Sequence, residues 1–299
     1  MRFERPPTID PVAAAHWHAT APALSPWLHE EVARRMEQRL QWIRQAPEAW
    51  CHWDPVRGGL QAHALVRARY PQALCHVVES APHLQPVATK ALAPAWWTAA
   101  RWKGAGVRFE VPAPGTVQML WANMALHMAA DPQALIAQWQ KALSVDGYLM
   151  FSCFGPDTLR ELRAVYEVLG WPVPAHAFTD MHDWGDMLIE AGFAEPVMDM
   201  ERITLTFASG PRLLQELREL GRNLHPARFA GLRGRRWKAD LEHALQERLA
   251  TPETEGQLAL TFEIVYGHAF KPTPRVPVAG ESAVSLQDMR AMLRGNPRR

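Results

Sequence analysis

The segment 222–238 carries six basic side chains and no acidic one. Clustered positive charge can attract and steer an acidic partner. An exposed loop and helix start without any partner is an equally open interpretation. Nucleic-acid binding needs a continuous basic face, whereas this segment is short and the net charge of the chain is only +1. The six residues are Arg222, Arg228, Arg233, Arg235, Arg236 and Lys238.

Metal binding and thiol chemistry have less support in the sequence. His176, His182 and Asp183 lie close together, but their spacing matches no zinc motif, and Asp183 is better explained as the N-cap of a helix. The three cysteines show no CxxC or metal-like spacing. They are Cys51, Cys75 and Cys153. We therefore predict no metal site and three buried thiols in a reduced cytosol.

The elements that position such side chains alternate between helix and strand from Ser25 to Cys153. Leu74–Glu79 and Thr116–Ala122 are short apolar runs typical of buried parallel strands. Helices are predicted at Leu60–Arg69 and after Asp131-Pro132. This alternation predicts an α/β fold with a doubly wound, mostly parallel sheet of the seven-stranded Rossmann-like type. Ligands of such sheets bind beyond the carboxyl ends of the strands.

The chain divides into three parts. Residues 1–24 contain prolines and small residues without periodicity, so we interpret them as an N-terminal arm or lid. Residues 25–270 form the sheet domain. Residues 271–299 form a Pro-rich tail with one short helix at Leu286–Leu293.

The sheet domain contains a predicted insertion. Val197–Phe207 and Leu258–His268 are strand-like, and the later one is expected to run antiparallel to its neighbours. The stretch 208–257 between them has helical periodicity. We interpret it as a helical cap that packs over the carboxyl ends of the strands.

Composition sets the class of protein. Of 299 residues, 48% are hydrophobic and 21% are charged, so a substantial core can form. No apolar run approaches the roughly 20 residues that span a bilayer. The stretch Met1–Ala15 lacks the apolar core of a signal peptide, and a cytoplasmic location without a membrane partner is expected.

Three stretches carry a resemblance to a known family. They are Phe151–Arg163 (FSCFGPDTLRELR), Asp180–Phe207 (DMHDWGDMLIEAGFAEPVMDMERITLTF) and Leu260–Pro272 (LTFEIVYGHAFKP). The GPDTL and DMHDxGD elements within them are more specific than glycine motifs shared by many folds. Through these elements the chain resembles the malonyl-acyl-carrier-protein O-methyltransferases of biotin synthesis, which are class I S-adenosylmethionine-dependent methyltransferases.

The resemblance implies a reaction and a partner. The family transfers the methyl group of S-adenosylmethionine to the free carboxylate of a malonyl thioester on acyl carrier protein. Transfer from a sulfonium to a carboxylate needs positioning and exclusion of water more than acid–base help. No catalytic group is therefore assigned, and the sequence shows no triad. Acyl carrier proteins are acidic, so the basic residues of 222–238 are the candidate partner-binding side chains.

The first cofactor motif of this class is altered. The family places a D-x-G-x-G-x-G pattern after its first strand, where glycine lets the backbone approach the cofactor. The aligned stretch here is Ala49–Gly59, AWCHWDPVRGG. Its four motif positions are His52, Asp54, Val56 and Gly58. Asp54 and Val56 are expected to project into the cofactor position and to weaken or abolish binding. An alternative register takes Asp54 as the acid, followed by Gly58 and Gly59.

Other candidate site residues follow from the same resemblance. Glu79 ends the second predicted strand, where the family's acid accepts the ribose hydroxyls, although a solvated acid at a strand end is the alternative. Asn123 matches a polar residue after the fourth strand, and a plain loop asparagine is equally open. Tyr166, Tyr266 and His268 are candidates for an acyl pocket, with core packing as the alternative.

Two functions follow from these observations. The first is an S-adenosylmethionine-dependent O-methyltransferase of biotin synthesis that acts on malonyl-acyl carrier protein. The alternative is a catalytically degenerate relative that binds acyl carrier protein or a partner methyltransferase. The altered glycine motif distinguishes the two, because it determines whether the cofactor binds.

Overall fold

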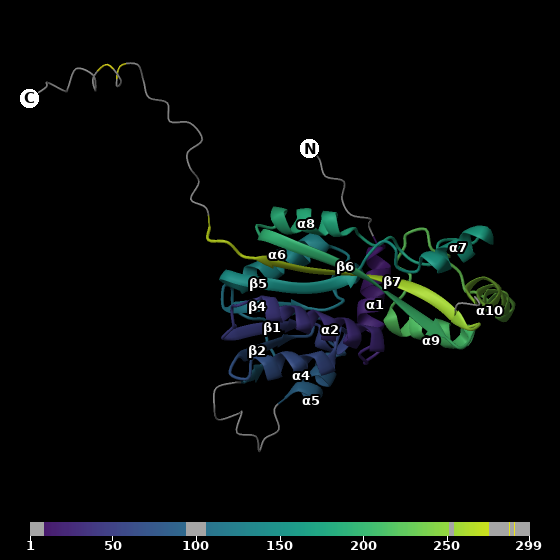
Figure 1. Cartoon of the computed structure of the whole chain (residues 1–299), viewed down its shortest axis with the longest axis horizontal. Coiled ribbons are helices and arrows are strands. Elements are labelled where there is room, and N and C mark those ends of the chain that lie inside the picture. Colours follow the sequence, from purple (N-terminus) through teal and green to yellow (C-terminus); the bar gives the residue numbers. More distant parts are fainter. Residues whose placement is uncertain (1–8, 94–105, 251–253, 275–286, 288–289, 291–299) are drawn as a thin grey trace, which may run out of the picture.

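The computed structural model of the protein describes residues 9–93, 106–250, 254–274, 287 and 290 (Figure 1). Seven strands form one sheet in the order β3-β2-β1-β4-β5-β7-β6. The strands are β1 (Ala49–Trp53), β2 (Leu74–Val78), β3 (Val107–Arg108), β4 (Val117–Ala122), β5 (Leu143–Phe154), β6 (Ala194–Phe207) and β7 (Leu258–Phe270). Among these seven strands of the described residues, only β7 runs antiparallel to its neighbours, β5 and β6. The doubly wound, mostly parallel sheet predicted from the sequence is confirmed.

Helices cover both faces of the sheet because the central strands present apolar side chains on both faces. On β4, Met119 and Trp121 join one core cluster, and Leu120 and Ala122 join the other. The helices on the first face are α2 (Trp27–Arg39), α4 (Leu60–Arg69) and α5 (Gln85–Leu92). Those on the second face are α6 (Pro132–Ala142) and α8 (Met181–Glu190).

Local sequence signals explain where several helices begin. The side chain of Asp131 accepts a hydrogen bond from the Ala134 amide at 2.9 Å and caps α6. Helix α8 begins after Asp180, whose carboxylate accepts the His182 amide at 2.8 Å. Asp183 therefore lies in the first turn of α8, and its predicted role as the N-cap is wrong.

The N-terminal arm contains α1 (Pro11–Thr20), which packs against the chain that follows α9 (Gly210–Leu220). The Asp10 amide donates to the Leu224 carbonyl at 2.8 Å, and Trp17 shares a small apolar cluster with Leu224. Residues 1–8 of the arm lie outside the described residues, and the same holds for the predicted tail helix apart from positions 287 and 290.

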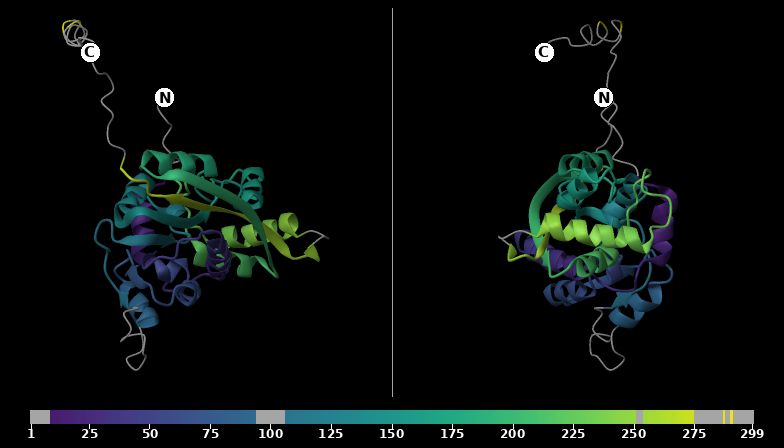
Figure 2. Two further views of the ribbon diagram at one scale, coloured as in Figure 1. Left: turned by 60° about the vertical axis from the view of Figure 1, so that its left-hand side comes forward. Right: turned by 90° about the vertical axis from the view of Figure 1, so that its right-hand side faces the viewer.

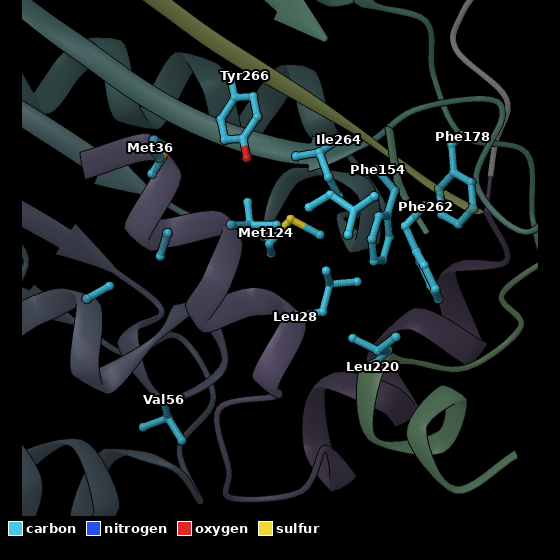
Figure 3. Packing of buried hydrophobic residues seen from close by; sticks show 14 of the residues in the cluster. Leu28, Met36, Val56, Met124, Phe154, Phe178, Leu220, Phe262, Ile264 and Tyr266 are labelled. Atoms are coloured by element: carbon cyan, nitrogen blue, oxygen red, sulfur yellow. The ribbon is translucent and has the colours of Figure 1, made fainter. Parts of the chain in front are cut away.

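The segment 208–257 contains α9 (Gly210–Leu220) and α10 (Arg235–Leu249), which lie side by side at one end of the molecule (Figure 2). The short helices elsewhere are η1 (Leu40–Trp42), α3 (Pro55–Gly58), η3 (Leu126–Met128) and α7 (Arg160–Val168). An apolar cluster joins the sheet, α2 and the cap through Phe154, Phe262, Leu28 and Leu220 (Figure 3). In the described part of the chain, no helix has the length and apolar character needed to cross a membrane.

Candidate active site

Two cavities lie at the carboxyl ends of the parallel strands. The first, which we call the strand-end cavity, has a volume of about 300 Å³ and is lined by residues that follow β1, β2 and β4. The second, the cap cavity, has a volume of about 280 Å³ and lies between the end of β5, α7 and the helical cap. Met128 and Leu220 line both cavities, so the two are neighbours.

The turn after β1 forms one wall of the strand-end cavity. Asp54 adopts a left-handed conformation with φ 49° and ψ 55°, which residues other than glycine seldom adopt. Its carboxylate accepts the Ser80 amide at 2.8 Å. In return, the Glu79 carboxylate accepts the Val56 amide at 3.2 Å. The two acids thus link the turn after β1 to the turn after β2.

The same two acids share a poorly solvated environment. Burial raises the pKa of Glu79, and the neighbouring charge of Asp54 raises it further, to about 8. Burial also raises the pKa of Asp54, against the opposing effect of its hydrogen bonds with Ser80. Because each negative charge disfavours the other, the pair holds a proton at neutral pH.

Two side chains of the altered glycine motif do not face the strand-end cavity. Val56 is fully buried in the hydrophobic core on the α2 side of the sheet (Figure 3). His52 is also fully buried, and its Nδ1 lies 3.0 Å from Nδ1 of His63 on α4. The expectation that Val56 projects into the cofactor position is therefore wrong, because the α3 turn directs it into the core. Of the substituted positions, Asp54 alone lines the strand-end cavity within the described residues.

The two retained glycines are explained by close contacts. A Cβ atom on Gly58 would lie 2.9 Å from the Asn123 carbonyl oxygen. Gly59 has φ +123°, and a Cβ there would lie 2.8 Å from Oε2 of Glu30. Gly58 lines the strand-end cavity, whereas Gly59 lies behind it, at the start of α4.

Asn123 lines the strand-end cavity and fixes its geometry. Its amide nitrogen donates to the carbonyl oxygens of His29 at 2.9 Å and Gly58 at 2.5 Å. Its Oδ1 accepts the Ser152 hydroxyl at 2.6 Å. The side chain therefore joins α2, the glycine turn and β5, which makes it a structural part of the cavity wall.

Arg57 ties the glycine turn to both the arm and the cap. Its guanidinium donates to the carbonyl oxygens of Leu24 at 3.0 Å and Leu220 at 3.2 Å, and also to that of Glu219. It lies over the Trp17 ring, 5.3 Å from the centroid. Burial is the main cause that lowers the pKa of Arg57, to about 10, so the side chain stays charged at neutral pH. Sequence patterns do not mark Arg57, because its partners are distant in the chain.

The cap cavity is mostly apolar. Phe154, Phe178 and Phe262 line it from the sheet side, while Leu217 and Leu241 line it from the cap. Such a lining removes water from whatever binds inside. It is therefore suited to an acyl group rather than to a free polar ligand.

Two histidines that the sequence analysis did not assign as acyl-site residues line the cap cavity. His176 donates from Nε2 to the His127 carbonyl at 3.1 Å and accepts the Leu224 amide at 3.4 Å. The Phe154 amide donates to Nδ1 of His127 at 3.5 Å, which leaves the proton of that ring on Nε2. Burial lowers the pKa of His176 to about 4 and that of His127 well below its usual range, so both are neutral at pH 7.

Some of the predicted partner-binding residues have internal partners. Arg228 pairs with Asp10, with 2.6 Å between Nη1 and Oδ2, and so holds the arm. The Arg233 guanidinium lies 4.0 Å from the ring centroid of Trp237 and 4.5 Å from that of Phe229. These contacts give Arg228 and Arg233 structural roles within the cap region.

The remaining basic residues lie nearer to solvent. Arg235 and Arg236 are exposed in the first turn of α10. Lys238 lines the cap cavity and pairs with Glu242 at 3.3 Å. Arg222 lines the same cavity. The structure therefore brings Arg222 and Lys238 to a cavity and places Arg235 and Arg236 on the surface beside it.

The residues predicted for an acyl pocket or a metal site lie in two different places. Tyr166 lines the cap cavity, whereas Tyr266 and His268 line a different groove together with Phe270 and Trp42. His176 belongs to the cap cavity, and no group of three or more potential metal ligands gathers anywhere in the described ranges.

The sheet order and the strand-end cavity define the class I methyltransferase fold. A putative methyltransferase from Bacillus halodurans superposes with a TM-score of 0.50 at 13% identity, covering 81% of this chain and 100% of that one. The YcgJ protein from Bacillus subtilis gives a TM-score of 0.51 at 13% identity, covering 82% of this chain and 99% of that one. At this level of identity the likeness shows the fold.

Sequence relatives define the family. A malonyl-[acyl-carrier protein] O-methyltransferase from Laribacter hongkongensis is 36% identical over 255 residues, which cover 83% of this chain and 84% of that one. One from Gallionella capsiferriformans is 35% identical over 269 residues, covering 86% and 88%. No family model matches the chain. With this identity over most of both chains, the protein belongs to the malonyl-[acyl-carrier protein] O-methyltransferase family.

Proposed function

We propose that the protein is a cytoplasmic S-adenosylmethionine-dependent O-methyltransferase that methylates the free carboxylate of malonyl-acyl carrier protein in biotin synthesis. The observation that carries the proposal is the pair of cavities that adjoin at Met128 and Leu220. A two-substrate transfer needs two sites that meet at the reacting atoms. The names of the sequence relatives support the choice of acyl substrate.

The residues of the strand-end cavity fit the cofactor. Glu79 is buried at the end of β2, where a carboxylate accepts hydrogen bonds from ribose hydroxyls. Gly58 and Asn123 form the facing wall, and Val56 leaves the cavity clear. When bound there, the cofactor supplies an electrophilic methyl group on a sulfonium sulfur.

The fit has one obstacle, which is Asp54. Its side chain stands on the cavity wall where the family has glycine, and its carboxylate repels that of the methionine moiety. The affinity for S-adenosylmethionine is therefore lower than that of an ordinary family member by about tenfold or more, a difference of about 1.4 kcal/mol.

The chain assists the transfer by positioning and by excluding water. The acyl group enters the cap cavity, where Phe154, Leu217 and Leu241 displace solvent from the carboxylate. The acceptor is already ionised, so no side chain has to remove a proton. The neutral His127 and His176 add no charge to this cavity.

Mass spectrometry of the carrier protein tests the proposal. Malonyl-acyl carrier protein is incubated with the purified protein and S-adenosylmethionine, with the Laribacter hongkongensis relative as a positive control. We expect the carrier to gain one methyl group. An unmodified carrier at saturating cofactor, under conditions where the relative is active, would overturn the proposal.

One observation favours a second candidate, a binding module that does not transfer methyl groups. Asp54 places a carboxyl group on the wall of the strand-end cavity, and Arg57 bonds to the arm and to the cap beside it. A protein that had lost the cofactor would still hold an acyl group in the cap cavity. Calorimetric titration distinguishes the two candidates, because the module binds malonyl-acyl carrier protein without binding S-adenosylmethionine.

A further inference from the structure

The acceptor carboxylate has to lie where the strand-end cavity meets the cap cavity. Met128 and Leu220 line both cavities at this junction. The chain after Leu220 packs directly on Met128, since a Cβ atom on Gly221 would lie 3.4 Å from the Met128 Cε. The next residue, Arg222, therefore stands beside the junction.

Arg222 contacts both sides of the junction. Its side chain lines the cap cavity, and its guanidinium lies 5.3 Å from the ring centroid of Trp17, which lines the strand-end cavity. Arg57 lies at the same distance from the same ring. Two guanidinium groups and one indole thus converge here from the cap, the glycine turn and the arm.

Within the part of the chain that the structure describes, the charge on Arg222 has no carboxylate partner. One of its terminal nitrogens donates to the carbonyls of Arg218 at 2.6 Å and Gly221 at 3.0 Å, and no carboxylate of the described residues lies within ion-pair distance. The other cations of this region differ, since Arg228 pairs with Asp10 and Lys238 pairs with Glu242. The guanidinium of Arg57 donates its hydrogen bonds to backbone carbonyl oxygens.

We propose that Arg222 binds the free carboxylate of the acyl substrate and makes the cap cavity select carboxyl-terminated acyl thioesters over uncharged ones. The inference rests on the proposed function, because it places the acyl group in the cap cavity. A guanidinium offers paired donors to a carboxylate, and the nearby charge of Arg57 strengthens the attraction. The carboxylate is then held at the wall of the strand-end cavity.

Thioester binding tests this assignment without methyl transfer. Malonyl-pantetheine and acetyl-pantetheine, which differ by one carboxylate, are titrated calorimetrically into the full-length protein. We expect the wild type to prefer the malonyl thioester by about tenfold or more, as a charged hydrogen bond requires. In Arg222→Gln this preference disappears while the affinity for acetyl-pantetheine stays unchanged.

Two further variants make the result specific. Arg222→Lys keeps the charge without the paired donors and should retain part of the preference. Lys141→Gln removes an exposed cation on α6 that lines neither cavity and should behave as the wild type. Retained discrimination in Arg222→Gln, or a wild type that binds both thioesters equally or binds neither, would overturn the inference.

The two proposals fail separately. A wild type that discriminates between the thioesters but never methylates the carrier protein supports the role of Arg222 and refutes the proposed enzyme. A wild type that methylates the carrier, with Arg222→Gln showing the same discrimination, refutes the role of Arg222 alone.

Discussion

Asp54 and Glu79 accept hydrogen bonds from each other's turns. The Asp54 carboxylate accepts a hydrogen bond from the amide of Ser80, the residue after Glu79. The Glu79 carboxylate accepts one from the amide of Val56, two residues after Asp54. These two hydrogen bonds join the end of β1 to the end of β2, and both carboxyl groups are poorly solvated. Its titration therefore affects both the stability of the fold and the strand-end cavity.

Replacement of Glu79 with Gln should change how stability depends on pH. The pKa of Glu79 is raised from 4.5 to about 8, so the folded state keeps a proton that the unfolded state has already lost. Folding stability attributable to Glu79 therefore falls as pH rises from about 5 to 8. In Glu79→Gln this fall should be smaller, as measured by thermal unfolding across that range. The exposed Glu190→Gln serves as a control, and parallel curves for Glu79→Gln and the wild type would contradict the prediction.

Replacement of Asp54 with Gly should improve cofactor binding. Glycine adopts φ 49° without steric strain, and the change removes both the Cβ atom and the carboxylate from the cavity wall. Calorimetry should show an affinity for S-adenosylmethionine about tenfold higher. An unchanged affinity would mean that Asp54 is not the obstacle.

Replacement of Val56 with Gly should not improve cofactor binding, although the sequence motif has glycine at both the Asp54 and the Val56 positions. Val56 is fully buried in the core and does not line the cavity, so its loss leaves a void. We expect a loss of about 2 kcal/mol in the free energy of unfolding and no gain in cofactor affinity. Denaturant unfolding measures the first quantity and calorimetry the second. A tighter cofactor complex in this variant would show that Val56 reaches the cavity after all.

Replacement of Arg57 with Ala should loosen the arm. The change removes donors to the carbonyls of Leu24 and Leu220, which lie in the arm and at the end of α9. The amides of α1 should exchange with solvent about tenfold faster in hydrogen-exchange measurements. Arg34→Ala is a matched control, because Arg34 bonds to Glu31 within its own helix. Equal exchange rates of the α1 amides in both variants would show that Arg57 does not hold the arm in place.

Replacement of Arg235 and Arg236 with Ala should weaken binding of acyl carrier protein. Both side chains are exposed at the start of α10, beside the cap cavity. The loss should lie mainly in the association rate and should flatten its dependence on salt. Stopped-flow binding at low and high salt measures both effects. Arg233 is left in place because it packs among aromatic rings, and identical rates for variant and wild type at low salt would remove these residues from the docking surface.

The sequence predicted the fold better than it predicted the site. Buried strands such as β2 and β4 are apolar runs of the length a sheet requires, and α4 ends as expected, at Arg69 before Tyr70-Pro71. The direction of a side chain within a tight turn has no comparable sequence pattern. The sequence therefore predicts Val56 in the cavity, whereas the structure places it in the core. The contacts of Arg57 and His127 were missed because their partners come from distant segments.

The pairing of β6 with β7 has a consequence for how this family can diversify. Phe207 and Leu258 face each other at the end of the antiparallel pair, so the chain leaves for the cap and returns at the same point. A tight hairpin could join these two residues without disturbing the register of the sheet. A change in the length of the segment between Phe207 and Leu258 therefore need not shift any strand of the sheet.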